Sequence, residues 1–379
     1  MWCGSKLNRP TGQRFRTGLE GVLVAPVTEQ ADNRLLLGDT LKGVSRSFYL
    51  TIRVLPSNMR RPVAVAYLLA RAADTIADTP ALPPHERLEK LLSFRALVEG
   101  RGPAEDVSRI MSGVRGAGEG ASPSETALLG SSGNILALLD ELPESDRSRV
   151  RSVVATLTRG MELDLTTFPA EDSGAVAALQ SPEELDCYTY LVAGCVGGFW
   201  TLVATAHEPR LSRWDAEGMS ELGIRFGKAL QLTNVLRDVP RDLRNGRCYL
   251  PEPDLTRAGL SPADLLEPAN SGRARSVLAP WIRVALGHFD AAESYLLATP
   301  RRCLRLRLAA LWPILLGLAT LQKLAVNENW LDPGRPSRVR RRWVYGMMAR
   351  SLLSAPSDTL LRLWIRGLRR RVERALDGW

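Results

Sequence analysis

Apolar residues recur along most of this chain at intervals of three and four positions, and alternating strand patterns are hard to find. This spacing places the apolar side chains on one face of an α-helix, so it predicts an all-α protein. Residues 1–33 are polar instead, and we expect them to form a flexible leader. Helices are predicted over 34–56, 59–78, 84–100, 124–140, 144–168, 181–207, 213–245, 272–298, 302–326 and 357–376.

The pattern also bounds the domain organisation. No repeat of fixed period is visible. The helical pattern predicts one large domain over 34–330, followed by a tail over 331–379. The Gly- and Ser-rich stretch 111–133 is expected to be a loop. Its glycines do not follow a strand, which argues against a dinucleotide-binding turn. The apolar run 308–321 contains Pro313 and is shorter than the roughly 20 residues of a membrane span, so it predicts a buried helix.

Cysteine content and charge narrow the setting. The five cysteines are scattered and contain no CxxC pair, so neither a disulfide framework nor a zinc site is indicated, and we expect a cytoplasmic protein. From residue 335 onward the chain has 12 arginines and three acidic residues, and this segment therefore carries the whole formal net charge of +9.

The predicted helix 357–376 is basic and amphipathic. It can lie on an anionic membrane, giving peripheral contact with the inner face of a bilayer, or its apolar stripe can pack on the body of the protein. Both arrangements stay open. A nucleic-acid partner is not expected, because no matching fold or aromatic platform accompanies the charge. The stripe consists of Leu361, Trp364, Ile365, Leu368, Val372 and Leu376.

Two sets of acidic residues occur at helical spacing. Asp74 and Asp78 are four residues apart at the end of an apolar run, and Asn234, Asp238 and Asp242 repeat the same interval. Residues four apart share a helix face, and clustered carboxylates need a cation. Mg²⁺ prefers oxygen ligands and completes its sphere with substrate phosphates, so these two acidic ladders, with arginines around them, predict a Mg²⁺–diphosphate site. Pro240 lies inside the second ladder, where the helix is expected to kink or end.

Several segments together resemble the squalene/phytoene synthase family, in the order that the family has them. The resemblance covers about 38–330 and is highly specific as a set, whereas a lone DxxxD would not be. The segments are "SRSFYLTIRVLP" (45–56), "YLLARAADTIAD" (67–78), "RGMELDL" (159–165), "YTYLVAGCVGGFW" (188–200) and "QLTNVLRDVPRDLRNGRCYLP" (231–251).

The resemblance implies a single-domain isoprenoid-synthase helical bundle with a central apolar cavity. It also implies roles for individual residues. Tyr188 would assist ionisation or proton transfer, although it could be an ordinary core aromatic, and Ser47 could be a backbone cap. The glycines of "VAGCVGG" either permit close helix packing or leave room for a prenyl chain. The implied Mg²⁺ ligands are Asp74, Asp78, Asn234, Asp238 and Asp242, and the implied diphosphate-binding residues are Ser47, Tyr67, Arg71, Gln231, Arg237 and Arg247.

Within the family, "RAADTIADT" is most similar to squalene synthases, and "NGRCYLP" to phytoene synthases and some bacterial squalene-forming enzymes. The expected activity is therefore squalene synthesis: two farnesyl diphosphates condense through presqualene diphosphate, and NADPH reduces the product. The alternative is a phytoene, dehydrosqualene or presqualene diphosphate synthase without the reductive step. A catalytically silent homologue that docks on membranes is a third possibility.

Overall fold

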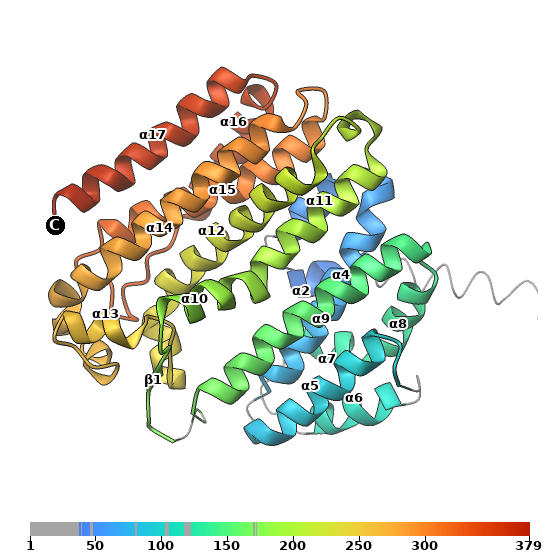
Figure 1. Ribbon diagram of the computed structural model, residues 1–379, viewed down its shortest axis with the longest axis horizontal. Coiled ribbons are helices and arrows are strands. Elements are labelled where there is room, and N and C mark those ends of the chain that lie inside the picture. Colours follow the sequence, from blue (N-terminus) through green and yellow to red (C-terminus); the bar gives the residue numbers. More distant parts are fainter. Residues whose placement is uncertain are drawn as a thin grey trace, which may run out of the picture.

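The computed structural model describes residues 38, 40–45, 48–79, 82–102, 106–116, 123–169, 171 and 173–379. Ser47 and the proposed leader 1–33 lie outside the described residues. The described chain is a single helical domain, and the all-α prediction is confirmed. Its long helices lie side by side in a bundle, with the C-terminal helix on one outer side (Figure 1). The main helices are α4 (Ser57–Ala77), α5 (Pro84–Val98), α9 (Glu144–Thr167), α11 (Cys195–His207), α12 (Ala216–Asp242), α14 (Ser271–Ala298), α15 (Leu304–Ala325), α16 (Arg341–Ser354) and α17 (Asp358–Asp377).

Shorter elements connect these helices. The helix expected over 34–56 is divided into α2 and α3, and the helix expected over 124–140 is divided at Ser131 into α7 and α8. The loop expected over 111–133 is wrong in part, because α6 ends and α7 begins within it. Burial of Val107, Ile110 and Met111 explains why α6 forms beside glycines. The short helices are α2 (Leu41–Ser45), α3 (Phe48–Val54), α6 (Asp106–Gly116), α7 (Pro123–Gly130), α8 (Ser132–Asp140), α10 (Pro182–Thr189) and α13 (Glu252–Arg257).

Two very short strands, β1 (Ala177–Ala178) and β2 (Arg247–Cys248), pair in parallel with Ala177 opposite Arg247. They fix the segment after α9 against the segment after α12. Gly246 precedes β2 with a φ of 76°, a conformation that glycine adopts without the steric cost that a side chain brings. The pairing therefore fixes the backbone position from which the Arg247 side chain extends.

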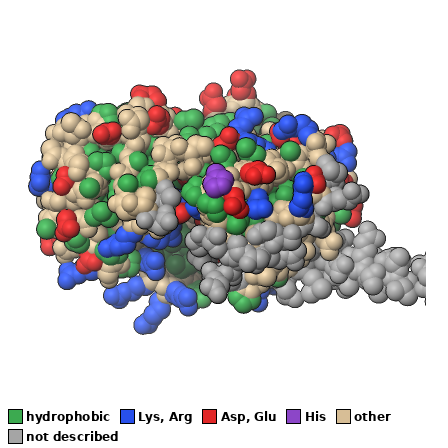
Figure 2. All heavy atoms as spheres, turned by 90° about the horizontal axis from the view of Figure 1, so that it is seen from below, with side chains coloured by type: hydrophobic (Ala, Val, Ile, Leu, Met, Phe, Trp, Pro, Cys, Tyr) green, Lys and Arg blue, Asp and Glu red, His purple; other side chains and the backbone are tan. Residues whose placement is uncertain are grey.

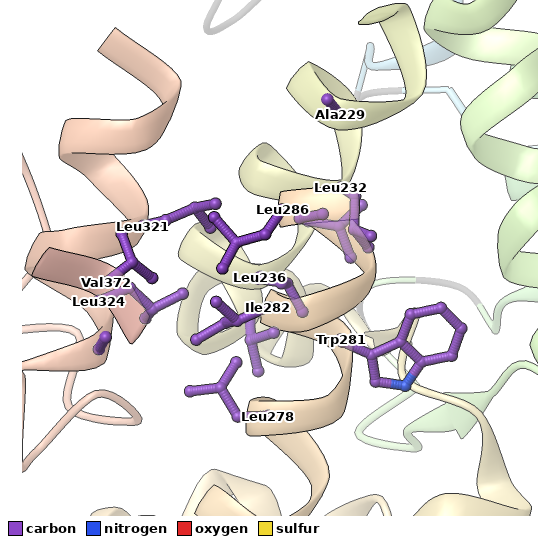
Figure 3. Close-up of a cluster of buried hydrophobic side chains, with 14 of the residues drawn as sticks. Ala229, Leu232, Leu236, Leu278, Trp281, Ile282, Leu286, Leu321, Leu324 and Val372 are labelled. Carbon is purple, nitrogen blue, oxygen red and sulfur yellow. The ribbon is translucent and has the colours of Figure 1, made fainter. Parts of the chain in front are cut away.

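The buried side chains fall into two clusters, one built mainly on α4 and α9 and one on α12, α14 and α15. Figure 3 shows the second cluster, in which Val372 of α17 lies beside Leu321 and Leu324 of α15. Thus the apolar stripe of α17 packs on the body of the protein, the second of the two arrangements expected from the sequence. Leu361, Ile365, Leu368, Val372 and Leu376 are all buried, and Trp364 is half-buried.

Two helical segments, Pro182–His207 and Leu304–Ala325, are long and apolar enough to cross a membrane by length and composition. Core helices of soluble proteins meet the same criterion. The second segment is mostly covered by other helices, which agrees with the buried helix predicted around Pro313.

Candidate active site

The first acidic ladder lies at the C-terminal end of α4. One face of this helix is buried through Leu68, Leu69 and Ala72, which leaves Asp74 at the edge of the core with 36% of its side chain exposed. Asp78 caps the helix, and its backbone N–H donates to the carbonyl of Asp74 over 2.9 Å. Burial and the nearby Asp78 carboxylate raise the pKa of Asp74 to about 6, although Arg71 pairs with it and opposes the shift. Carboxylates are unfavourable at the negative end of a helix, so this end favours a cation.

The second ladder occupies the same position on α12. The helix continues through Pro240 to Asp242, so it does not end at this proline. Pro240 falls in the last turn, where its missing N–H removes only one of the final backbone hydrogen bonds. Asp238 accepts from Arg237 Nε over 2.8 Å. Burial and Asp238 raise the pKa of Asp242 to about 6.

Arg247 joins the two ladders. Its Nη1 lies 3.9 Å from Asp78 Oδ1 and 4.0 Å from Asp164 Oδ2, and its Nη2 donates to Glu171 over 3.1 Å. The charge of Arg247 also acts on the pKa of Asp242. Burial alone would lower the pKa of Arg247, but Tyr249 and its anionic neighbours raise it, so the guanidinium remains protonated. One permanent cation thus lies within electrostatic reach of acids from both helices.

Three residues around Arg247 were missed by reasoning from the sequence. Asp164 of α9 accepts from Tyr188 Oη over 3.3 Å and from Tyr249 Oη over 3.0 Å, while the two tyrosine rings stack with centroids 4.5 Å apart. Burial raises the pKa of Asp164 to about 7 despite Arg247. Glu171 bridges Arg247 and the buried Arg87. A signal existed for two of them: Asp164 lies inside "RGMELDL", and Tyr249 lies inside "NGRCYLP", two residues after Arg247.

The remaining predicted residues are distributed around the ladders. Tyr67 Oη donates to the carbonyl of Val44 over 3.3 Å, and Arg71 Nη2 donates to Glu125 over 2.5 Å. Asn234 is one turn before Asp238 on α12, and Gln231 is half-buried one turn before Asn234. Tyr188 is buried at the end of α10.

An apolar cavity of about 450 Å³ begins beside these polar groups. Tyr67 and Asn234 lie in its wall, and the rest of the lining is mainly aliphatic and aromatic, including Phe199, Trp200 and Phe226. Helices α11 and α15 both contribute to this lining. The expectation of a bundle with an apolar cavity is therefore confirmed.

A second cavity of about 280 Å³ adjoins the first, since Thr51, Leu230, Asn234 and Pro313 line both. Arg237 of α12 lies in its wall, and α16 closes it with Val344, Met347 and Met348. The end of the molecule that carries β1 shows a hollow with hydrophobic atoms in its wall and basic side chains gathered beside it (Figure 2).

Of the glycines in "VAGCVGG", which were expected to serve either packing or space, Gly197 does both. A Cβ at Gly197 would lie 1.8 Å from the Gly223 carbonyl oxygen, and a Cβ at Gly227 would lie 2.2 Å from that of Ala193. The backbones of α11 and α12 are therefore in direct contact. Gly197, Gly223 and Gly227 also line the larger cavity, so their missing side chains enlarge it.

The chemistry of the ladders fits Mg²⁺. Among the described residues no three His, Cys, Asp or Glu side chains converge on one point, so each ladder offers at most two carboxylates to an ion. That is the number Mg²⁺ takes from proteins when phosphate oxygens and water complete its octahedron. Burial, followed by repulsion from the second carboxylate of each ladder, raises the pKa values of Asp74 and Asp242, and a bound cation would offset both effects.

Comparison with known proteins identifies the family and the fold. The family model for squalene/phytoene synthases matches residues 41–343. A presqualene diphosphate synthase of Rhodopseudomonas palustris is 30% identical over 263 residues, covering 68% of this chain and 77% of the relative. A squalene synthase of Eremothecium gossypii is 25% identical over 296 residues, covering 77% of this chain and 62% of the relative. The structure of TcSQS in complex with the ligand BPH1237 superposes with a TM-score of 0.68 at 21% identity, covering 92% of this chain and 99% of that one, and shows the same fold.

Proposed function

Because this chain belongs to the squalene/phytoene synthase family of prenyltransferases, we propose that it condenses two farnesyl diphosphates head to head to presqualene diphosphate. We propose further that it reduces this intermediate to squalene with NADPH. The observation that carries the proposal is Arg247, set between acids of two helix ends beside an apolar cavity.

The ladders and arginines would hold the diphosphate. Asp74 and Asp78 on α4, and Asp238 and Asp242 on α12 with Asn234, are the proposed Mg²⁺ ligands. Bound Mg²⁺ would neutralise the charge that develops on the departing diphosphate. Arg71, Arg237 and Arg247 would donate to phosphate oxygens that remain, because guanidinium N–H pairs match their geometry.

Tyr188 is the proposed proton carrier. Its hydroxyl donates to Asp164, so a proton that reaches Tyr188 can pass to the buried carboxylate of Asp164. Burial keeps the pKa of Tyr188 well above its ordinary value. The tyrosine therefore stays neutral, and its single O–H can donate to a diphosphate oxygen once it turns away from Asp164, while the stacked ring of Tyr249 fixes the plane of its ring.

The apolar cavity would protect the cation. Ionisation leaves a carbocation on the prenyl chain, and water would trap it. A wall built from aliphatic and aromatic groups excludes water and offers ring faces to positive charge. The adjoining smaller cavity, which contains Arg237 and Asn234, would accommodate part of the second substrate.

A presqualene diphosphate synthase without the reductive step is the second candidate. The Rhodopseudomonas palustris relative, at 30% identity over 77% of its length, favours it. The two candidates differ in the second half of the reaction: the first ionises presqualene diphosphate, rearranges the cation and reduces it with hydride from NADPH, whereas the second releases presqualene diphosphate with its diphosphate intact.

Product analysis separates them. Purified protein is incubated with farnesyl diphosphate and Mg²⁺, with and without NADPH, and products are identified by mass spectrometry. Squalene that forms only with NADPH supports the leading proposal, and presqualene diphosphate under both conditions supports the second candidate. Product formed from geranylgeranyl diphosphate but not from farnesyl diphosphate would contradict both candidates. No product from either prenyl diphosphate would favour the silent homologue.

A further inference from the structure

Four leucines stand out on the surface of the α16–α17 hairpin, which comprises residues 341–377. Leu352 and Leu353 end α16 with 61% and 83% of their area exposed, and Leu360 and Leu363 begin α17 with 48% and 60% exposed. Exposed leucines gathered at one turn mark an interaction surface more often than leucines scattered singly. We propose that this hairpin docks on an anionic phospholipid surface through these leucines and the arginines beside them.

A groove between the two helices connects three of these leucines. It has a volume of about 690 Å³ and is lined by Leu353, Leu360 and Leu363 together with Trp343 and Trp364. Aromatic side chains with a polar edge favour the interface between headgroups and acyl chains. The four exposed leucines lie outside the stripe of α17 that packs on the body of the protein, and Trp364 lies at the border between the stripe and the groove, so docking requires no detachment of the tail.

The arginines of the hairpin supply the charge that an anionic surface attracts. Arg366 and Arg369 pair with Glu293 and Asp290. By contrast, Arg362, Arg370 and Arg371 have no carboxylate partner within the described part of the chain, and Arg350 stacks over Trp364 at 5.0 Å. Asp358, the acid nearest the turn, is already paired with Arg301 and Arg307. Each such arginine near a membrane strengthens binding about fivefold.

Charge also selects the occupant. A second copy bound face to face would bring the same unpaired arginines together, and like charges oppose that contact. Residues 1–37 contain five basic and three acidic residues, so they too have the wrong sign. Anionic lipid complements both the leucines and the arginines.

The position of α16 connects the proposed membrane docking with the proposed prenyl site. Met347 lines both the exterior groove and the smaller cavity beside Arg237. A single helix therefore separates the proposed prenyl site from the face that would meet the bilayer. A C30 hydrocarbon product is insoluble in water, and this arrangement places its cavity one helix away from lipid. This last point rests on the proposed function, whereas the docking does not.

The test is sedimentation of the full chain with vesicles of phosphatidylglycerol and phosphatidylcholine, or of phosphatidylcholine alone, without substrate. Binding is expected only to the anionic vesicles and should fall as salt rises. Leu353→Ser with Leu363→Ser should weaken it at least tenfold, and Arg362→Gln with Arg371→Gln about 25-fold. Matched controls are Leu202→Ser, an exposed leucine on α11, and Arg283→Gln on α14.

Undiminished binding by the leucine variants, or equal binding to neutral vesicles, would overturn the proposal. So would a dimer in solution that the same leucine substitutions dissociate. Unchanged circular dichroism and melting temperature establish that the variants fold, and Leu353→Ser alone is available should the double variant fail. Since binding is measured without turnover, an inactive protein that still binds vesicles would contradict the proposed activity alone.

Discussion

Single carboxylates carry the proposed chemistry, and their environments differ enough to be tested separately. We expect Asp74→Asn and Asp238→Asn each to lower kcat by about 100-fold or more, because loss of one preorganised electrostatic contact typically costs that much. Steady-state rates at saturating Mg²⁺ measure the effect. Asp140→Asn, which removes an exposed acid paired with Arg151, is the matched control and should retain normal rates. Near-normal turnover by either ladder variant would refute the assigned role.

Asp164 makes a prediction about pH in the metal-free protein. Burial raises its folded pKa to about 7 from an ordinary 3.8, so the folded state binds a proton that the unfolded state has lost. The stability it contributes is complete below about pH 4 and is lost as the pH rises through 7, at most about 4 kcal/mol. Asp164→Asn should therefore gain stability relative to the wild type between pH 5 and pH 8 in urea denaturation. A difference between the two proteins that does not change with pH would contradict this.

At the scale of the residue, the sequence predicts much of the site. Both ladders and Arg247 follow from spacing and from family resemblance, and the structure places Arg247 between acids of the two helix ends. Asp164 lies in a segment that carries the family resemblance, but Glu171 could not be predicted as part of this cluster, because nothing local distinguishes it from a surface acid. The pairing of β1 with β2 holds the backbone of Arg247, whose side chain reaches both acids.

Among the elements, the contact between α11 and α12 depends on glycine. Gly197→Ala should destabilise the protein by about 1–3 kcal/mol or more, since the new Cβ would overlap the Gly223 carbonyl and force the helices apart. Gly287→Ala on α14 is the control: a Cβ added there would have nothing within 4 Å, and alanine should stabilise by roughly 0.5–1 kcal/mol. Chemical denaturation measures both. Equal effects would mean that the close contact has no energetic role.

The orientation of α17 can be tested with two neighbouring residues. Ile365 is 2% exposed and Leu363 is 60% exposed. Ile365→Ala should cost about 2–5 kcal/mol of unfolding free energy, and Leu363→Ala should change it by less than about 0.5 kcal/mol. The reverse order would show that the other face of the helix packs on the body.

The elements themselves were predicted unevenly. Long amphipathic helices such as α9 and α14 follow directly from the three-and-four spacing, and so does the stripe of α17. The sequence could not decide whether that stripe meets lipid or protein, because both partners select the same pattern. Helix α16 was missed, since its two faces meet a cavity and a groove and its apolar residues therefore form no single stripe.

For the whole molecule, the two acidic ladders belong to different parts of the core. One buried cluster packs α4 against α9, and the other packs α12 against α14 and α15, so each acidic helix end is held by its own cluster. The cavity lies where these clusters meet. The net charge, by contrast, is concentrated in the tail, where folding does not require it.

The carboxylate of Glu171 accepts hydrogen bonds from the guanidinium groups of Arg87 and Arg247. Arg87 lies in α5 and is 2% exposed. A pyrophosphate that drew Arg247 away would leave Glu171 bound to Arg87 alone and alter how tightly α5 is anchored. Thermodynamic reciprocity then requires that loosening α5 change the affinity for that anion. If amide hydrogen exchange along 84–98 is slower with the anion than without it, that change would report occupancy of the diphosphate site from a helix that the ligand does not touch.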